Sequence, residues 1–181
     1  DAPDLFQKAK QAAFYAKQNG KNRIQVYEGN IDAERRNKET GYEQVAPTAY
    51  ALVAAIDAKD SFTFQHSTNV SQYAVLLAQK LGLPGDDIHT VKVAGLLHDI
   101  GKIGIPESIL KKAGKLTNEE YEIMKSHVQK SIEMIHYLPN MNYVIPAVVS
   151  HHERYDGKGY PRGLKGEEIP LLGRILAVCD S

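Results

Sequence analysis

The stretch "LLHDIGK", residues 96–102, decides the fold, because an apolar run ends there in two ionisable side chains. Leu96 and Leu97 lead directly into His98 and Asp99. A buried charge is costly unless it is paired, and nothing inside the heptapeptide supplies a partner for Asp99 at close range. We therefore expect the partner to come from elsewhere in the chain or from an ion.

Helical patterns surround this stretch from residue 45 onward. The spacing i, i+3, i+4 and i+7, typical of an amphipathic helix, falls on Ala49, Leu52, Val53 and Ile56. Asp86 or Asp87 is expected to cap the helix that ends in the heptapeptide, and a later helix begins with a capping box of Thr117 and Glu120. "YVIPAVVSHHE" predicts another helix, with its proline in the first turn. Because no convincing strand follows residue 30, we predict an all-α fold.

The beginning of the chain has a different pattern. Residues 4–18 place small apolar side chains on one helical stripe, and the segment after them alternates like a short strand. This is too little to bury a core. We expect residues 1–27 to be the tail of another domain, residues 28–59 a linker with a lead-in helix, and residues 60–181 the main domain.

Composition and charge exclude two classes of partner. Lys plus Arg and Asp plus Glu both number 22, so bulk attraction to nucleic acid or to an anionic membrane is not expected. The longest apolar run, 49–56, is too short to span a bilayer.

The chain opens with Asp1 rather than Met, so we expect a piece of a longer protein. The single Cys179 excludes an internal disulfide and suits a cytoplasmic location, with the cytoplasmic part of a larger sensor protein as an alternative.

Histidine and aspartate side chains lie beside apolar segments of several predicted helices. The set consists of His66, His98, Asp99, His127, His151, His152 and Asp180. A divalent cation offsets buried carboxylates, and neutral imidazole is a good ligand for it. Because adjacent helix residues point roughly 100° apart, the two adjacent pairs suit two ions that share Asp99 better than one tetrahedral ion. Mixed nitrogen and oxygen ligands favour iron or manganese over a structural zinc site.

Simpler interpretations stay open for other residues. A lone histidine is usually only hydrogen-bonded, and we expect this for His89 and His136. Lys102 is either a cation at a helix C-terminus, where it interacts with the dipole, or a catalytic charge. Turn chemistry alone accounts for the glycines and the proline of "DGKGYP", residues 156–161.

Five separated motifs resemble HD-GYP domains in order and spacing. They are "HSTNV" (66–70), "LLHDIGKIGIP" (96–106), "KLTNEEYEIMKSH" (115–127), "HHERYDGKGYPRGLKGEEIP" (151–170) and "RILAVCD" (174–180). The resemblance covers roughly residues 60–181 and implies an HD-superfamily helical bundle. It places the family's metal ligands on the seven residues above, its lysine on Lys102, and its name-giving tripeptide on Gly159, Tyr160 and Pro161. Residues 1–27 resemble the last helix and strand of an α/β GGDEF domain, although Lys10 stands where that family usually has Asp.

The chain departs from the HD-GYP pattern at three places. Phe62 stands where some members have a glutamate that holds a third metal, so we expect two ions. Ser131 stands where a glycine is usual, which is expected to shift that helix slightly. The family's last helix continues beyond Asp180, so we expect a C-terminally truncated domain that binds metal but binds or cleaves substrate poorly.

The family resemblance implies a metal-dependent phosphodiesterase that opens cyclic di-GMP to pGpG and then forms GMP. Asp99 and Lys102 are the expected catalytic residues, and Lys102 and the Gly159–Pro161 loop are expected to bind substrate, with GGDEF proteins as further partners. Two alternatives remain: a non-catalytic cyclic di-GMP sensor or GGDEF-docking module, and an HD-type hydrolase of another nucleotide. The resemblance implies no oligomeric state.

Overall fold

The computed structural model describes residues 47, 49–56 and 63–181, all within one unit of the chain, Lys38–Ser181. The GGDEF-like tail and Phe62 lie outside the described residues. The expectations about them, and the expected domain boundaries, stay predictions.

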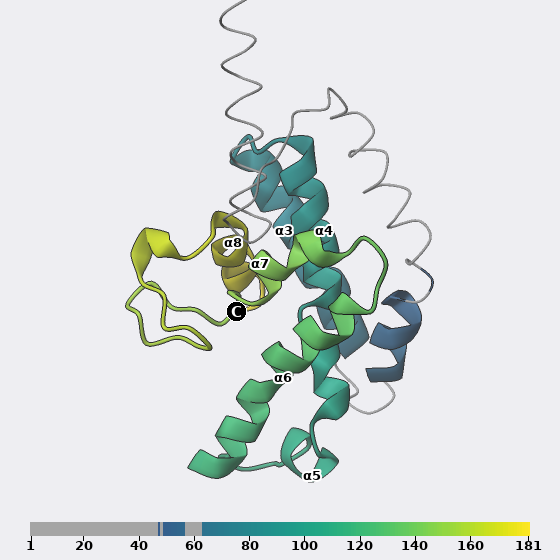
Figure 1. Ribbon diagram of the computed structural model, residues 1–181, viewed down its shortest axis with the longest axis vertical. Helices are drawn as coiled ribbons and strands as arrows, with labels where there is room; N and C mark the ends of the chain where they lie inside the picture. Colours follow the sequence, from purple (N-terminus) through teal and green to yellow (C-terminus); the bar gives the residue numbers. More distant parts are fainter. Residues whose placement is uncertain (1–46, 48, 57–62) are drawn as a thin grey trace, which may run out of the picture. The chain divides into compact units, whose positions relative to one another are not determined.

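Helices make up the regular structure of the described residues (Figure 1). A helix over residues 49–56 is followed by α3 (Thr63–Lys80), α4 (Gly85–Leu97), η1 (Ile100–Gly104), α5 (Glu107–Leu110), α6 (Asn118–His136), η2 (Asn142–Val144), α7 (Ile145–Val148), η3 (Gly166–Glu168) and α8 (Leu171–Cys179). No strand occurs within residues 49–56 and 63–181, which confirms the all-α prediction there. None of these helices is both long and apolar enough to cross a bilayer.

Helix α4 is the central element of the apolar core. It packs against α3, α7 and α8, and its apolar side chains between Val91 and Leu97 are almost fully buried, whereas Lys92 is exposed. A Cβ atom at Gly95 would lie 2.7 Å from the Cα atom of Ser71, so the lack of a side chain there lets α3 approach α4 closely. The C-terminal end of α4 therefore delivers His98 and Asp99 into the interior of the protein.

The capping predictions have different outcomes. Thr117 Oγ1 accepts from the Glu120 backbone N–H, and Glu120 Oε2 accepts from the Thr117 backbone N–H, which confirms the capping box of α6. The expectation that Asp86 or Asp87 caps α4 is wrong, because the N-cap residue is Pro84, whose carbonyl accepts the first backbone bonds. Both aspartates instead lie in the first turn, where negative charge is favourable.

The helix expected to carry His151 and His152 is shorter than predicted. Helix α7 has its proline in the first turn, as required, but ends at Val148. The Ser150 and Glu153 N–H groups bond to carbonyls only three residues earlier, so the backbone tightens into a turn. The two histidines consequently lie on a turn that leads into the glycine-rich loop.

Candidate metal centre

Five regions of the chain bring the seven expected residues together. His66 lies in the first turns of α3, His98 caps the C-terminus of α4, Asp99 precedes η1, His127 lies in α6, His151 and His152 follow α7, and Asp180 caps the C-terminus of α8. They form two groups, one of Asp99, His127, His151 and His152 and one of His66, His98, Asp99 and Asp180. In each group the potential ligand atoms lie within 4.8 Å of one another. Asp99 belongs to both groups, as expected for a shared ligand.

In three of the histidines, a backbone carbonyl determines which ring nitrogen carries the proton. Nδ1 of His98, His127 and His151 lies 2.8, 2.7 and 2.5 Å from the carbonyl oxygen three residues earlier. A carbonyl oxygen only accepts hydrogen bonds, so Nδ1 must carry the proton. The Nε2 atoms of all three rings are buried without a hydrogen-bond partner. With Nδ1 protonated, each Nε2 atom faces the cluster, where it can hold either a second proton or a metal ion.

Asp99 lies between these rings and is almost fully buried. Its Oδ2 atom is 3.3 Å from His98 Nε2, and its Oδ1 atom is 3.3 Å from His127 Nε2. Oδ2 also accepts a 2.6 Å bond from Lys102 Nζ. The expectation that the heptapeptide holds no partner for Asp99 is therefore wrong, because the tight turn of η1 brings the side chain at i+3 over the carboxylate.

The ionisation of His98 and Asp99 shows that this cluster requires positive charge to compensate its carboxylates. Burial lowers the pKa of His98, but the Asp99 and Asp180 carboxylates outweigh it and raise the pKa to about 10. Burial raises the pKa of Asp99, but His98 and then Lys102 hold it well below its usual range. Without a metal, a proton on His98 compensates part of the carboxylate charge. A divalent cation would supply the same compensation and would use the lone pair that this proton occupies.

The other side of the cluster keeps its imidazoles neutral. Burial, followed by the charge on His98, holds the pKa of His151 well below its usual value. Burial, followed by the charge on His127, lowers the pKa of His152 to about 4. Both rings are thus unprotonated at neutral pH, which is the state that a metal ligand must have.

His66 and Asp180 form the more open side of the cluster. His66 Nε2 lies 2.8 Å from Asp180 Oδ1, and His98 Nε2 lies 3.3 Å from the same oxygen. The His66 side chain is 38% exposed, whereas that of His98 is 1% exposed. A group from solvent can therefore reach the cluster from the side of His66.

The donor set fits divalent metal ions. Buried Nε2 atoms without partners, a buried carboxylate between them and neutral rings are the features of a preformed ligand cage. The single cysteine, Cys179, belongs to neither group. Nitrogen and oxygen donors without thiolate match iron, manganese or catalytic zinc rather than a structural zinc site.

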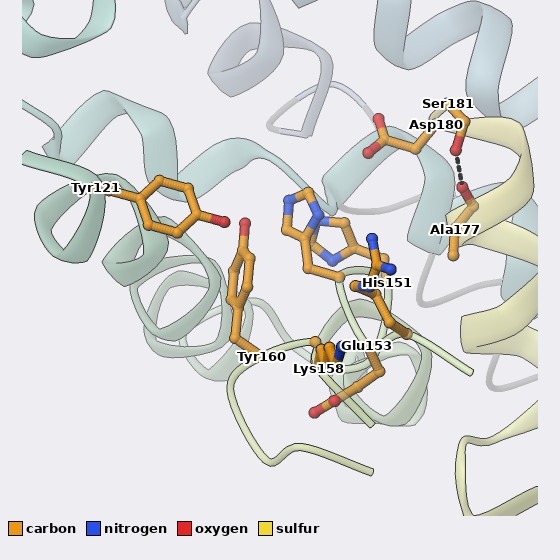
Figure 2. A pocket seen from close by; sticks show the side chains of 11 residues that line it. Tyr121, His151, Glu153, Lys158, Tyr160, Ala177, Asp180 and Ser181 are labelled. Atoms are coloured by element: carbon orange, nitrogen blue, oxygen red, sulfur yellow. Dashed lines mark hydrogen bonds between the residues drawn. The ribbon is translucent and has the colours of Figure 1, made fainter. Parts of the chain in front are cut away.

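A cavity of about 360 Å³ lies beside the cluster (Figure 2). Figure 2 shows Tyr121 and Tyr160 on one side of it and Asp180 on the other. The Tyr160 ring stacks on His152, with centroids 4.7 Å apart and planes 27° apart. Gly159 also lines the cavity, whereas Pro161 is exposed and does not. Two residues of the tripeptide expected to bind substrate, Gly159 and Tyr160, therefore lie beside the cluster.

The profile of the HD domain family, whose members are metal-dependent, matches residues 51–181. The chain belongs to the HD domain family. It is 42% identical over 140 residues to the cyclic di-GMP phosphodiesterase response regulator RpfG of Xanthomonas campestris. This match covers 76% of this chain and 37% of the relative. It is 40% identical over 143 residues to 3'3'-cGAMP-specific phosphodiesterase 1 of Vibrio cholerae, which covers 79% of this chain and 33% of the relative.

This HD domain thus spans about a third of the length of these two curated relatives. A solved structure, described as a HDG"Y"P protein from Bdellovibrio bacteriovorus, matches with a TM-score of 0.56 at 22% sequence identity. The match covers 83% of this chain and 51% of that one, and it shows that the two share a fold.

Three residues that line the cavity of this HD domain were not predicted from the sequence as part of the site. Arg154 and Lys158 line the cavity together with Tyr121. The two basic residues flank "YDG" directly after the histidine pair, and a search for phosphate-binding charges near the ligands would have found them. Tyr121 carries no such signal, because its proximity to Tyr160, 6.3 Å between ring centroids, depends on how α6 packs against the loop.

The two histidines for which hydrogen bonds were expected make them. His89 Nε2 lies 3.0 Å from the Tyr143 hydroxyl, and His136 Nδ1 lies 2.8 Å from Asn142 Oδ1. Neither belongs to the two ligand groups of the described residues.

Proposed function

We propose that this HD domain is of the HD-GYP type and hydrolyses a phosphodiester bond of cyclic di-GMP. The observation that carries the proposal is Asp99, a buried carboxylate common to two ligand groups beside a cavity that basic and aromatic side chains line. A shared carboxylate between two sets of nitrogen donors suits a two-metal site. Relatives named as phosphodiesterases of cyclic dinucleotides support the same substrate class.

We assign the two ions, iron or manganese, to the two ligand groups. His127, His151 and His152 would hold one ion, His66, His98 and Asp180 the other, and Asp99 would contact both. Two divalent ions in such a site supply an activated water nucleophile and neutralise charge on the phosphodiester. The chain's own contribution is to orient three of the ligand rings through Nδ1 and to keep His151 and His152 neutral.

The other proposed roles follow from the positions of the side chains around the cavity. Lys102 places a positive charge beside Asp99, where it would stabilise negative charge that develops on the phosphodiester. Lys158 would attract the second phosphate of a cyclic dinucleotide, beside Arg154, whose guanidinium Asp156 already binds with both carboxylate oxygens. Tyr160, held face to face with His152, offers an apolar ring to a nucleobase. The proposed product is pGpG, followed by GMP.

The test uses matched histidine variants of one helix. The full chain, loaded anaerobically with Fe²⁺ or with Mn²⁺, is incubated with cyclic di-GMP, and the products are separated by chromatography. We expect pGpG to form slowly, as the poor cleavage expected of this chain requires, His127→Ala to reduce the rate by more than about 100-fold, and His136→Ala to leave it unchanged. His136 lies on the same helix as His127 but outside the ligand groups.

The same experiment distinguishes the alternatives. Conversion of 3'3'-cGAMP but not of cyclic di-GMP would assign the site to another cyclic dinucleotide. Binding of cyclic di-GMP without any product, with both metals present, would identify a sensor or docking module. Equal rates for His127→Ala and wild type would remove the cluster from the mechanism.

A further inference from the structure

We propose that Ser131 is a positioning residue that holds the His98–Asp99 turn against α6 and so sets the geometry of the metal centre. The inference rests on the proposed metal-dependent function. His127 and Ser131 are four residues apart on α6 and therefore lie on the same face of that helix. His98 and Asp99 come from the end of α4, so something must keep the two elements in register.

The Ser131 hydroxyl makes a hydrogen bond at each end of the turn. Its Oγ atom donates to the His98 carbonyl oxygen at 2.8 Å and accepts from the Gly101 backbone N–H at 2.8 Å. The side chain is fully buried. Residues 98–101, which contain two of the proposed ligands, are thus bound at both ends to a single hydroxyl group on α6.

The backbones also meet directly at this junction. A Cβ atom at Gly101 would lie 2.0 Å from the His127 carbonyl oxygen and 2.5 Å from the Ser131 backbone nitrogen. The turn therefore lies on α6 at the residue that carries a proposed ligand. The 3.3 Å separation between Asp99 Oδ1 and His127 Nε2 spans this junction.

Removal of the hydroxyl would leave two buried backbone groups without a partner. The His98 carbonyl and the Gly101 N–H would then need water or a shift of the turn to be satisfied. Either response moves His98 and Asp99 relative to His127. Metal affinity depends on such supporting contacts, and their loss typically weakens binding 10- to 100-fold.

Ser71 provides a matched control at the contact between α3 and α4. Its hydroxyl donates to the Lys92 carbonyl at 2.7 Å, and it packs against Gly95 as Ser131 packs against Gly101. Ser71 is buried, joins two helices and belongs to neither ligand group. Removal of either buried hydroxyl should therefore lower the stability of the fold. Only removal of the Ser131 hydroxyl should also weaken metal binding.

The experiment measures metal binding by the full chain without substrate. Metal-free wild type, Ser131→Ala, Ser131→Thr and Ser71→Ala are titrated with Mn²⁺, free Mn²⁺ being followed by electron paramagnetic resonance, and with Fe²⁺ under argon. We expect wild type to bind two ions and Ser131→Ala to bind at least one of them about 10- to 100-fold more weakly. Ser131→Thr retains the hydroxyl and should restore the affinity. Ser71→Ala should lower the melting temperature without changing the affinity.

The outcomes separate the two proposals. Wild-type affinity in Ser131→Ala would overturn the role of Ser131 and leave the proposed function intact. A wild-type chain that binds neither ion would overturn both. If circular dichroism shows that Ser131→Ala is unfolded, Ser131→Cys takes its place, because its thiol is only a weak donor and acceptor. The same loss is expected, and unchanged affinity in that variant would equally overturn the inference.

Discussion

Asp99 shows how one side chain serves several neighbours at once. Its two oxygens face His98, His127 and Lys102 at 3.3, 3.3 and 2.6 Å. A fully buried carboxylate with a single partner would be unfavourable, and the surrounding positive and polar groups make its ionised form the stable one. Lys102 is the only one of the three that we do not assign as a ligand, so its contribution can be separated from metal binding.

Replacement of Lys102 should impair turnover and spare the metal. Lys102→Met removes the charge beside Asp99 but none of the proposed ligands, so we expect both ions to be retained. The turnover number with cyclic di-GMP should fall roughly 100-fold, the typical effect of losing one charge-stabilising donor. Metal analysis and steady-state kinetics on the same sample provide the measurement. Lys111→Met, which removes an exposed lysine paired with Glu107, is the control. An unchanged turnover number would assign Lys102 to the helix terminus alone.

At the scale of elements, one buried carboxylate accepts two backbone hydrogen bonds from the glycine-rich loop, which backbone bonds such as that from Tyr160 N–H to the His152 carbonyl also hold. Glu153 Oε1 accepts from the Arg162 backbone N–H at 2.7 Å, and Oε2 accepts from the Leu164 backbone N–H at 2.9 Å. Gly159 lies against the same turn, since a Cβ atom there would lie 2.3 Å from the Arg154 backbone nitrogen. The loop consequently folds back over the histidine pair and places Tyr160 on His152.

Loss of the Glu153 carboxylate should release this loop. Glu153→Ala leaves two loop N–H groups without their charged acceptor, so the free energy of unfolding should fall by about 1–3 kcal/mol. KM for cyclic di-GMP should rise more than the turnover number falls, because the loop lines the cavity and Glu153 is not a proposed ligand. Urea unfolding and kinetics measure both effects.

Glu168→Ala is the control for this variant. Glu168 is exposed and accepts one bond, from the Lys165 backbone N–H. Its removal should change the free energy of unfolding by no more than about 0.5 kcal/mol. Equal destabilisation by the two variants would contradict the special role of Glu153.

At the scale of the whole molecule, the histidine cluster couples folding to pH and to metal. His152 has its pKa lowered from 6.5 to about 4, so between these values the unfolded chain binds a proton that the folded chain does not. His98 has its pKa raised from 6.5 to about 10, so above 6.5 the folded chain binds the extra proton. Stability rises with pH where the unfolded state holds more protons, and it falls in the opposite case.

The metal-free chain should therefore be most stable near pH 6.5. Its free energy of unfolding should decrease towards about pH 5 through His152 and His151, and towards about pH 9 through His98. Urea unfolding across this range, in the presence of a chelator, provides the measurement. Saturation with Mn²⁺ should abolish the decrease on the alkaline side, because the cation takes the place of the His98 proton. A metal-free chain whose stability increases steadily towards pH 9 would contradict this account.

The residues and local patterns were sufficient to predict the helical class, the capping box at Thr117 and the set of histidines and aspartates. The helical class and the capping box depend on side chains within one or two helical turns of each other, where 3.6-residue geometry alone determines which side chains meet. The set of histidines and aspartates was predicted from residue type and apolar surroundings, not from local contacts. The wrong cap of α4 and the shortened α7 show where local patterns fail. Backbone hydrogen bonds of the adjacent turn decide where α4 begins and where α7 ends.

Tertiary structure alone decided how the site is assembled. His66 and Asp180 meet across 114 residues of sequence, and Ser131 reaches the His98 carbonyl across 33. The sharing of Asp99 was predicted from the sequence, but the Lys102 contact and the cavity that α6, the loop and the end of α8 line together depend on how the chain packs. Distances between atoms on different helices follow from the shape of the whole core, which no local pattern of residues contains.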